Sequence, residues 1–386
     1  MKRRGRTFNW VVKLSKFCNL RCSYCYEWDG LGDPARLDLE KLSRFLDVFI
    51  KNVGMPGDCH NFIWHGGEPL VLPFSYLTEF IRIQNDLKVG FSQRELSFSN
   101  AIQTNLVSVK PKHIEFLQEN DFLVGVSFDA VSGVRVDCAG KETESRVARN
   151  MELLRKQGLR FGAITVVGAH NVSRLKDIYR FYKEINCAVR FLPIYRDHLD
   201  SRYHHDRASI HDVFDALFGL FKVWVLDRDR ISVHPFSSWL EVALGFLSGD
   251  KLPIKGKSRI TIIDTSAKVY KIRSAYAESE ELGELGISVS DDLELAKKTE
   301  NLVQEPLGSP CADCRFRDYC LGQFVDTARP EMGPYCGVDY LAIEAAVKWI
   351  MEDGNLTDAA IQVFNGSRGT SDGETRLEID GAGFVV

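Results

Sequence analysis

The ten cysteines of this 386-residue chain restrict its fold and chemistry more than any other feature. Three are isolated, and seven fall into two tight groups near the two ends: Cys18, Cys22 and Cys25, then Cys311, Cys314, Cys320 and Cys336. Disulfide frameworks are rarely spread in this way over a long chain without a secretion signal, whereas metal and iron–sulfur sites are. The spacing therefore predicts two cluster sites.

Composition excludes several other classes of protein. Hydrophobic residues make up 45% and charged residues 26%, which are values of a globular chain. Forty-nine Lys and Arg against fifty-three Asp and Glu leave a net charge of -4, so we expect no nucleic-acid partner. No apolar run approaches the roughly 18 residues of a membrane span, and the amino-terminal residues lack the features of a signal peptide. We expect a cytoplasmic protein that does not bind a membrane.

Short β-prone runs alternate with helix-period runs through the first 230 residues. The predicted strands are residues 9–14, 62–64, 96–102, 122–128, 161–167 and 188–193. Strand-helix units with short loops predict parallel strands joined by right-handed crossovers, here a partial (β/α)6 TIM-like barrel of the α/β class. Such barrels place their chemistry at the carboxyl ends of the strands.

The alternation of predicted strands and helices ends after the barrel, and three regions are predicted. Residues 1–235 form the barrel, residues 236–354 form a small cysteine-rich auxiliary-cluster domain, and residues 355–386 form a flexible tail rich in Gly, Ser, Thr and Asp. Within the second region, residues 259–264 and 268–272 are β-prone and are expected to pair as a hairpin.

The first cysteine group directly follows the first predicted strand. A loop there can wrap three thiolates around a four-iron cluster and leave one iron open to an external ligand. A zinc site would need a fourth protein ligand, and neither Cys59 nor His60 has a finger-like spacing for that role.

The CxxxCxxC signature, with Tyr24 before its last cysteine, resembles the radical S-adenosylmethionine (SAM) superfamily, and in particular its peptide- and protein-modifying branch. The resemblance implies that Cys18, Cys22 and Cys25 bind a 4Fe-4S cluster whose open iron takes the amino and carboxylate groups of SAM. One electron then yields a 5'-deoxyadenosyl radical that removes a hydrogen atom from the substrate.

Further segments match the superfamily in order. The WHGGEP segment resembles its GGE motif, AIQTN its QTN segment, and VSFDA its VSxDG segment; Ala130 replaces the last glycine, and only the arginine of the HDxxR stretch remains. Glycines allow close backbone approach, a carboxylate accepts from an ammonium, and a guanidinium matches a carboxylate. The expected SAM-binding residues are Tyr24, Gly66, Gly67, Glu68, Gln103, Ser127, Asp129, Arg135 and Leu192.

The second cysteine group has two, five and fifteen residues between its members. Spacing alone leaves a fully ligated 4Fe-4S cluster and structural zinc equally open. The group resembles the SPASM-type extension of peptide-modifying radical enzymes, which favours the cluster. The predicted hairpin holds no cysteine and Phe324 stands where a further ligand is expected, so we predict one auxiliary cluster, and two clusters in total.

This reduced cysteine set resembles that of maturases that form three-residue cyclophanes in ribosomal peptides. The implied function is a carbon cross-link in a precursor peptide, with an electron donor such as flavodoxin or ferredoxin. The alternatives are formylglycine formation of the sulfatase-maturase type, peptide epimerisation, and a non-catalytic iron–sulfur scaffold. No catalytic residue can be named from the sequence.

Overall fold

The computed structural model of the chain describes residues 5–194, 206–251, 259–271, 281–304, 311–320, 336–352 and 360–363. The predicted tail lies outside these residues except at 360–363. Across the described ranges, no helix combines the length and the apolar character that crossing a bilayer requires.

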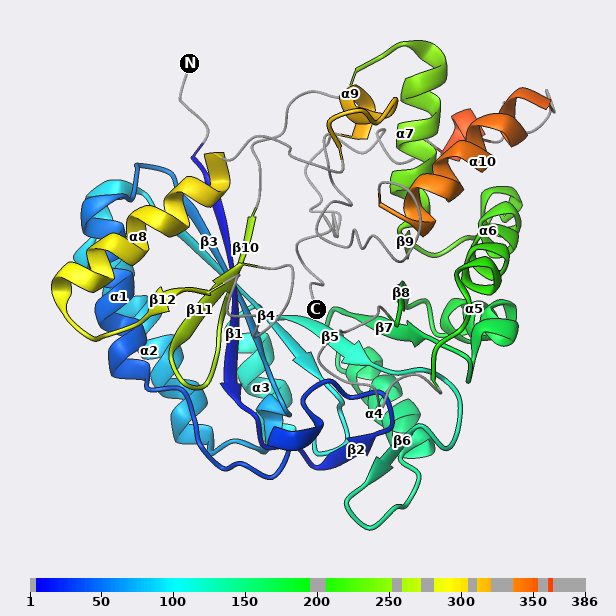
Figure 1. Cartoon of the computed structure of the whole chain (residues 1–386). Coiled ribbons are helices and arrows are strands. Elements are labelled where there is room, and N and C mark those ends of the chain that lie inside the picture. The colour runs from blue at the N-terminus through cyan, green and yellow to red at the C-terminus, as the bar shows by residue number, and fades with distance from the viewer. Residues whose placement is uncertain are drawn as a thin grey trace.

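In the described part of the chain, a ten-stranded sheet curves through the molecule (Figure 1), in the order β12-β11-β10-β1-β3-β4-β5-β7-β8-β9. Its strands are β1 (Thr7–Ser15), β3 (Cys59–Gly66), β4 (Ser97–Thr104), β5 (Leu123–Ser127), β7 (Phe161–Val167), β8 (Ala188–Pro193), β9 (Val233–His234), β10 (Arg259–Ile263), β11 (Lys268–Lys271) and β12 (Glu281–Glu284). A second, small sheet pairs β2 (Leu20–Cys22) with β6 (Arg135–Asp137).

The six predicted barrel strands are confirmed as β1, β3, β4, β5, β7 and β8, and neighbouring members pair in parallel. The predicted hairpin is also confirmed, since β10 and β11 pair antiparallel. The sequence did not indicate that β10 would pair in parallel with β1, with Phe8 opposite Arg259. The hairpin therefore extends the barrel sheet, because the open edge of β1 offers its unpaired backbone groups.

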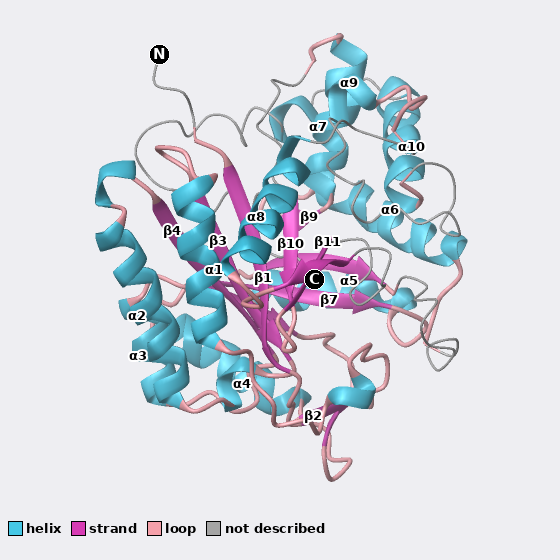
Figure 2. Cartoon of the chain, turned by 60° about the vertical axis from the view of Figure 1, so that its left-hand side comes forward, coloured by secondary structure: helices cyan, strands magenta, loops and turns pink. Residues whose placement is uncertain are grey.

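Helices cover the outer face of the barrel (Figure 2). They are α1 (Leu39–Asn52), α2 (Phe74–Gly90), α3 (Pro111–Glu119), α4 (Glu144–Lys156), α5 (Leu175–Glu184) and α6 (Ile210–Leu226). Within the described ranges, the connections hold four 3-10 turns: η1 (Trp28–Gly30), η2 (Pro69–Val71), η3 (Ser92–Arg94) and η4 (Val172–Arg174). Helix α1 begins where the Asp38 side chain accepts from the backbone N–H groups of Glu40 and Lys41, a favourable N-cap.

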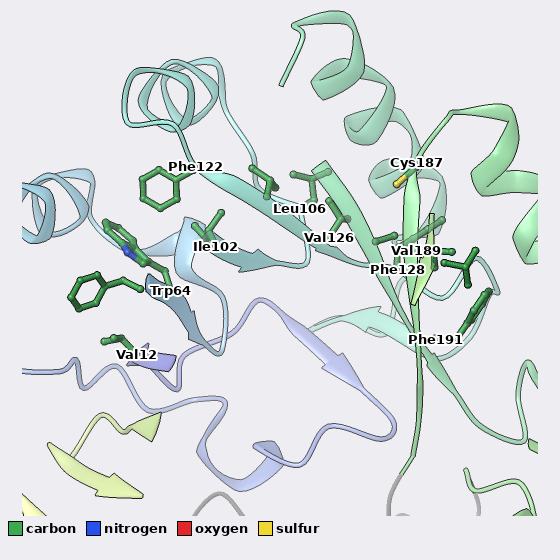
Figure 3. Packing of buried hydrophobic residues seen from close by; sticks show 14 of the residues in the cluster. Val12, Trp64, Ile102, Leu106, Phe122, Val126, Phe128, Cys187, Val189 and Phe191 are labelled. Carbon is green, nitrogen blue, oxygen red and sulfur yellow. The ribbon is translucent and has the colours of Figure 1, made fainter. Parts of the chain in front are cut away.

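Strand side chains alternate between this outer core and the inside of the barrel. On the outer side, Val12, Trp64 and Ile102 pack in the large hydrophobic core, part of which is drawn in Figure 3. Trp64 stacks on Phe80 of α2 at 4.7 Å between ring centres. A second apolar cluster, on the inner side, comprises Val11, Ile63, Ala101, Ile260, Ile262 and Tyr270. By the same alternation, the next inner positions toward the carboxyl ends hold polar residues.

The carboxyl-terminal elements are α7 (Phe236–Ser248), α8 (Val289–Gln304), α9 (Arg317–Cys320) and α10 (Val338–Glu352). Helix α8 packs on α1, whereas α7 packs on α10 and contacts α9. In both views α9 lies at the end of the molecule opposite β2 (Figures 1 and 2). The two cysteine groups are therefore on opposite sides of the barrel.

Candidate functional site

The first cysteine group lies in the loop that follows β1. Cys18 and Cys22 are buried, and Cys25 is partly exposed. The backbone N–H of Cys18 donates to Leu31 at 3.0 Å, and that of Cys25 donates to the carbonyl of Cys22 at 3.0 Å. These bonds fold the loop over the carboxyl end of the barrel.

N–H groups of the protein lie within hydrogen-bonding distance of two of the three cysteine sulfurs. The Leu20 N–H lies 3.4 Å and Asn105 Nδ2 3.7 Å from Cys18 Sγ, and Arg135 Nη1 lies 3.8 Å from Cys22 Sγ. Asn105 stands in the AIQTN segment but was not among the predicted site residues. Its place directly after a strand end, beside Gln103, was the available signal.

The chemistry of the donor set fits an iron–sulfur cluster. Burial raises the pKa of the Cys18 thiol to about 12 and that of the Cys25 thiol to about 11. Buried thiols of this kind remain protonated unless a metal supplies compensating positive charge, and thiolates are the usual ligands of such clusters. Within the described ranges, no three His, Cys, Asp or Glu side chains converge as they would around a single metal ion.

Gly66 and Gly67 hold the turn after β3 directly against the cysteine loop. Gly66 has φ +132°, and a Cβ there would lie 2.1 Å from the carbonyl oxygen of Ser15. A Cβ on Gly67 would lie 2.2 Å from the carbonyl oxygens of Lys16 and Phe17. The predicted need for close backbone approach is therefore met by the protein's own loop, whereas contact of this turn with SAM stays a prediction.

The Glu68 carboxylate is buried and accepts three hydrogen bonds from the chain. Oε1 accepts from the Leu70 N–H at 2.9 Å and from Thr104 Oγ1 at 2.6 Å, and Oε2 accepts from the Asn105 N–H at 2.6 Å. Burial raises the pKa of this carboxyl group. Glu68 thus joins the turn after β3 to the end of β4, and its contact with the SAM ammonium stays a prediction.

Two other predicted residues meet on the inner wall. Gln103 Nε2, at the end of β4, donates to Ser127 Oγ, at the end of β5, over 2.7 Å. Leu192 lies on β8 and is partly exposed. These positions are at the carboxyl ends of neighbouring strands, where a barrel places its ligands.

Tyr24, Asp129 and Arg135 form one buried network. Arg135 Nε donates to Asp129 Oδ2 at 2.8 Å, and the Tyr24 hydroxyl donates to the same oxygen. Asp129 Oδ1 accepts from the Val166 N–H at 2.8 Å. The sequence predicted each of these three as a SAM contact, and the structure adds that they bind one another.

A buried charge pair on the inner wall was not predicted. Lys13 Nζ, on β1, lies 2.6 Å from Glu27 Oε1 and 2.5 Å from the Tyr26 hydroxyl. His65, opposite Lys13 on β3, accepts from the Gly66 N–H at Nδ1, and its Nε2 is buried without a partner. A lone lysine in an apolar strand was the available signal. These side chains give the inner wall polar groups next to the cysteine loop.

The second cysteine group gathers around α9. The Cys314 N–H donates to the Cys311 carbonyl at 3.3 Å. Burial raises the pKa of the Cys336 thiol, Asp339 raises it further, and the nearby thiols Cys320, Cys314 and Cys311 add to the effect. These contributions place Cys336 near the other three cysteines of the group, and their binding of one shared centre stays a prediction.

Comparison with known protein families shows that residues 12–182 match the Radical SAM superfamily. This range contains the first cysteine group, the turn after β3 and the strands up to β7.

Curated relatives match over a longer stretch. A serine-type anaerobic sulfatase-maturating enzyme of Bacteroides thetaiotaomicron is 27% identical over 342 residues, covering 81% of each chain. A cysteine-type anaerobic sulfatase-maturating enzyme of Clostridium perfringens is 26% identical over 334 residues, covering 81% of this chain and 87% of the relative. The similarity therefore extends beyond residue 182.

Solved structures share the fold. Native anSMEcpe with bound AdoMet and Cp18Cys peptide matches with a TM-score of 0.68 and 20% identity, covering 92% of this chain and 99% of the other. Streptococcus suis SuiB bound to the precursor peptide SuiA matches with a TM-score of 0.54 and 12% identity, covering 81% and 71%. The architecture is therefore shared with proteins crystallised together with peptides.

Proposed function

Through residues 12–182 the chain belongs to the radical SAM superfamily, and on that premise we propose that it oxidises a side chain within a peptide or protein substrate. The observation that carries the proposal is the extent of the similarity, since sulfatase-maturating relatives match over 81% of this chain, far beyond the barrel residues. Those relatives are named for acting on another protein.

The superfamily implies a 4Fe-4S cluster and SAM, which together supply an electron and a group that accepts a hydrogen atom. We propose Cys18, Cys22 and Cys25 as the ligands of that cluster. The buried thiols of Cys18 and Cys22 accept N–H hydrogen bonds, and Gly66 and Gly67 let the turn after β3 pack against the cysteine loop. The loop is thereby held at the end of the barrel where strand carboxyl ends converge.

The substrate is proposed to reach this loop along the inner wall. Lys13, Glu27 and His65 line it with buried polar groups, and the inner apolar cluster lies beneath them. His65 has a pKa lowered to about 3 by burial and then by Lys13, so at neutral pH it stays uncharged. A peptide, with its amide donors and acceptors, suits a wall of this kind.

The preferred product is a carbon cross-link of the cyclophane type. The observation that favours it is the hairpin of β10 and β11, whose described residues 259–271 contain no cysteine and so offer no ligand to a third cluster. A cross-link is a net two-electron oxidation: two C–H bonds break, one bond between the two carbons forms, and two electrons and two protons leave. SAM held at the first cluster would take up one hydrogen atom at the expense of one electron from an external donor. The second proton would leave to solvent and the remaining electron to an acceptor, for which we propose the auxiliary cluster of the second cysteine group.

Formylglycine formation is the second candidate, because the curated relatives are named as sulfatase-maturating enzymes. It differs in its product, which is an aldehyde.

The test offers the anaerobically reconstituted enzyme, with SAM and a one-electron reductant, two sets of peptides. One set contains short precursors encoded beside the gene, and the other contains sulfatase peptides with serine or cysteine at the target position. A precursor that loses two hydrogens per link and does not react with hydroxylamine supports the cross-link. Hydroxylamine-reactive product from the second set supports formylglycine formation and refutes the cross-link as the main reaction.

Unchanged mass with one solvent deuterium incorporated identifies epimerisation. SAM cleavage without any change in either peptide set contradicts the proposal of peptide oxidation.

A further inference from the structure

The small sheet of β2 and β6 places an arginine directly opposite a proposed cluster ligand. In the antiparallel register, Leu20 faces Asp137, Arg21 faces Val136, and Cys22 faces Arg135. The Ser23 N–H donates to the Val134 carbonyl at 3.0 Å and continues the pairing. This local pairing fixes the backbone of Arg135 across from Cys22 independently of any bound cofactor.

The guanidinium of Arg135 is held in place from several sides. Nη1 points to Cys22 Sγ at 3.8 Å, and Nε donates to Asp129 Oδ2 at 2.8 Å. The guanidinium carbon lies 5.4 Å from the ring centre of Tyr24, which itself stacks on His170 at 5.6 Å. The Arg135 side chain is only 11% exposed and that of Asp129 only 1%. The contact with the sulfur is therefore made by an oriented, largely desolvated cation.

We propose that Arg135 raises the reduction potential of the cluster bound by Cys18, Cys22 and Cys25, through its hydrogen bond to Cys22 Sγ. Asp129 orients the guanidinium, and its negative charge limits the increase in reduction potential. The inference rests on the superfamily assignment and on the proposed cluster ligands. Arg135 thus acts on the cluster through its ligand Cys22, and the small sheet of β2 and β6 positions Arg135.

The physical reason is the change in charge on reduction. Reduction adds one electron to the cluster from a one-electron donor of the flavodoxin or ferredoxin class, so the reduced state carries one more negative charge. A cation and an N–H donor beside a ligating sulfur stabilise that state more than the oxidised one. In this structure the guanidinium contacts the sulfur itself, and the carboxylate is bonded to the guanidinium at Nε.

Replacing Arg135 and replacing Asp129 should shift the reduction potential of the cluster in opposite directions. Arg135→Gln removes the cation, and the equilibrium constant for one-electron reduction should fall tenfold or more, which corresponds to about 59 mV or more toward negative potential. Arg135→Lys keeps a positive charge without the planar guanidinium, so its cluster should have a reduction potential between those of Arg135→Gln and the wild type. Asp129→Asn removes the opposing charge and should raise the potential.

The assay is a redox titration of anaerobically reconstituted protein without SAM or substrate, monitored by the electron paramagnetic resonance signal of the reduced cluster. To isolate the first cluster, every protein carries Cys314→Ala and is checked for iron content and circular dichroism. The control is Arg36→Gln, because Arg36 is exposed and lies over the Tyr76 ring, and its potential should equal that of the wild type.

An Arg135→Gln potential equal to that of the wild type overturns the proposal. If Arg135→Gln fails to retain iron, Asp129→Asn decides: a higher potential supports the proposal, and an equal or lower one overturns it. Since no peptide is present, these results do not depend on which product the enzyme makes. Failure of the proposed function would leave the measured potentials unchanged.

Discussion

The Glu68 carboxylate offers the sharpest test of how the site is held together. Glu68→Ala removes the acceptor of three hydrogen bonds, from the Leu70 and Asn105 N–H groups and the Thr104 hydroxyl. A hydrogen bond to a charged group contributes about 1.5–3 kcal/mol, so three sum to at most about 5–9 kcal/mol. Burial of the carboxylate, which also raises its pKa, offsets part of this sum.

We therefore expect Glu68→Ala to lower the free energy of unfolding by about 3–5 kcal/mol, since each buried donor left unpaired costs about 1–3 kcal/mol. Thr104→Val removes one of the three bonds and should lower it by about 1–3 kcal/mol. Glu79→Ala is the matched control, because Glu79 is exposed on α2 and pairs with Arg82 at the surface, where the loss should stay below about 1 kcal/mol.

The assay is urea unfolding of the iron-free, SAM-free protein followed by circular dichroism, so cofactor binding does not contribute. SAM affinity is measured separately on reconstituted protein. If Glu68→Ala unfolds at the wild-type urea concentration, the carboxylate is not structural, and the reasoning from its three bonds is refuted. A loss of SAM affinity without loss of apo stability would then assign Glu68 to the ligand alone.

Three further predictions follow from the pKa shifts and the cysteine groups. Burial lowers the pKa of His60 to about 4 from 6.5, so its contribution to stability is lost as pH falls from 6.5 toward 4, by about 1.4 kcal/mol per pH unit. His60→Phe should flatten that part of the stability-versus-pH profile, and an unchanged slope contradicts the shift. Replacing Cys18, Cys22 and Cys25 together by Ala should remove about half of the roughly eight irons and all SAM cleavage; iron analysis that returns the wild-type content rules these ligands out. Cys314→Ala, if circular dichroism shows that it is folded, should still cleave SAM, because the second group lies at the opposite end of the molecule from the cysteine loop. It should form little cross-linked peptide, because the proposed electron acceptor is lost. Normal cross-linking without the auxiliary cluster argues against its role as electron acceptor.

The sequence was sufficient for the barrel strands and for grouping the cysteines. Alternating strand and helix periods depend on local side-chain order, and so residues 161–167 and 188–193 were predicted with the bounds that the structure has. The cysteine loop was predicted equally well, because its three cysteines are close together in the sequence.

Contacts between distant residues were not accessible in this way. The sequence predicted Glu68 as an acceptor from a ligand ammonium, but its present partners are Leu70, Thr104 at the end of β4 and Asn105 directly after that strand. The pairing of β10 with β1 joins the first barrel strand to a segment that lies beyond the predicted barrel in the sequence, with Phe8 opposite Arg259. Each of these contacts depends on strand order and register, which periodicity does not encode.

Residue types and local spacing thus determined the fold class, the two cysteine groups and the segments that surround them. Only the tertiary structure decided that Arg135 stands opposite Cys22 and that Lys13 pairs with Glu27 beside His65. Local patterns arise from chain geometry that repeats every two or about 3.6 residues. Hydrogen bonds and ion pairs between distant segments exist only after the strands have paired and water has been excluded from the groups that meet there.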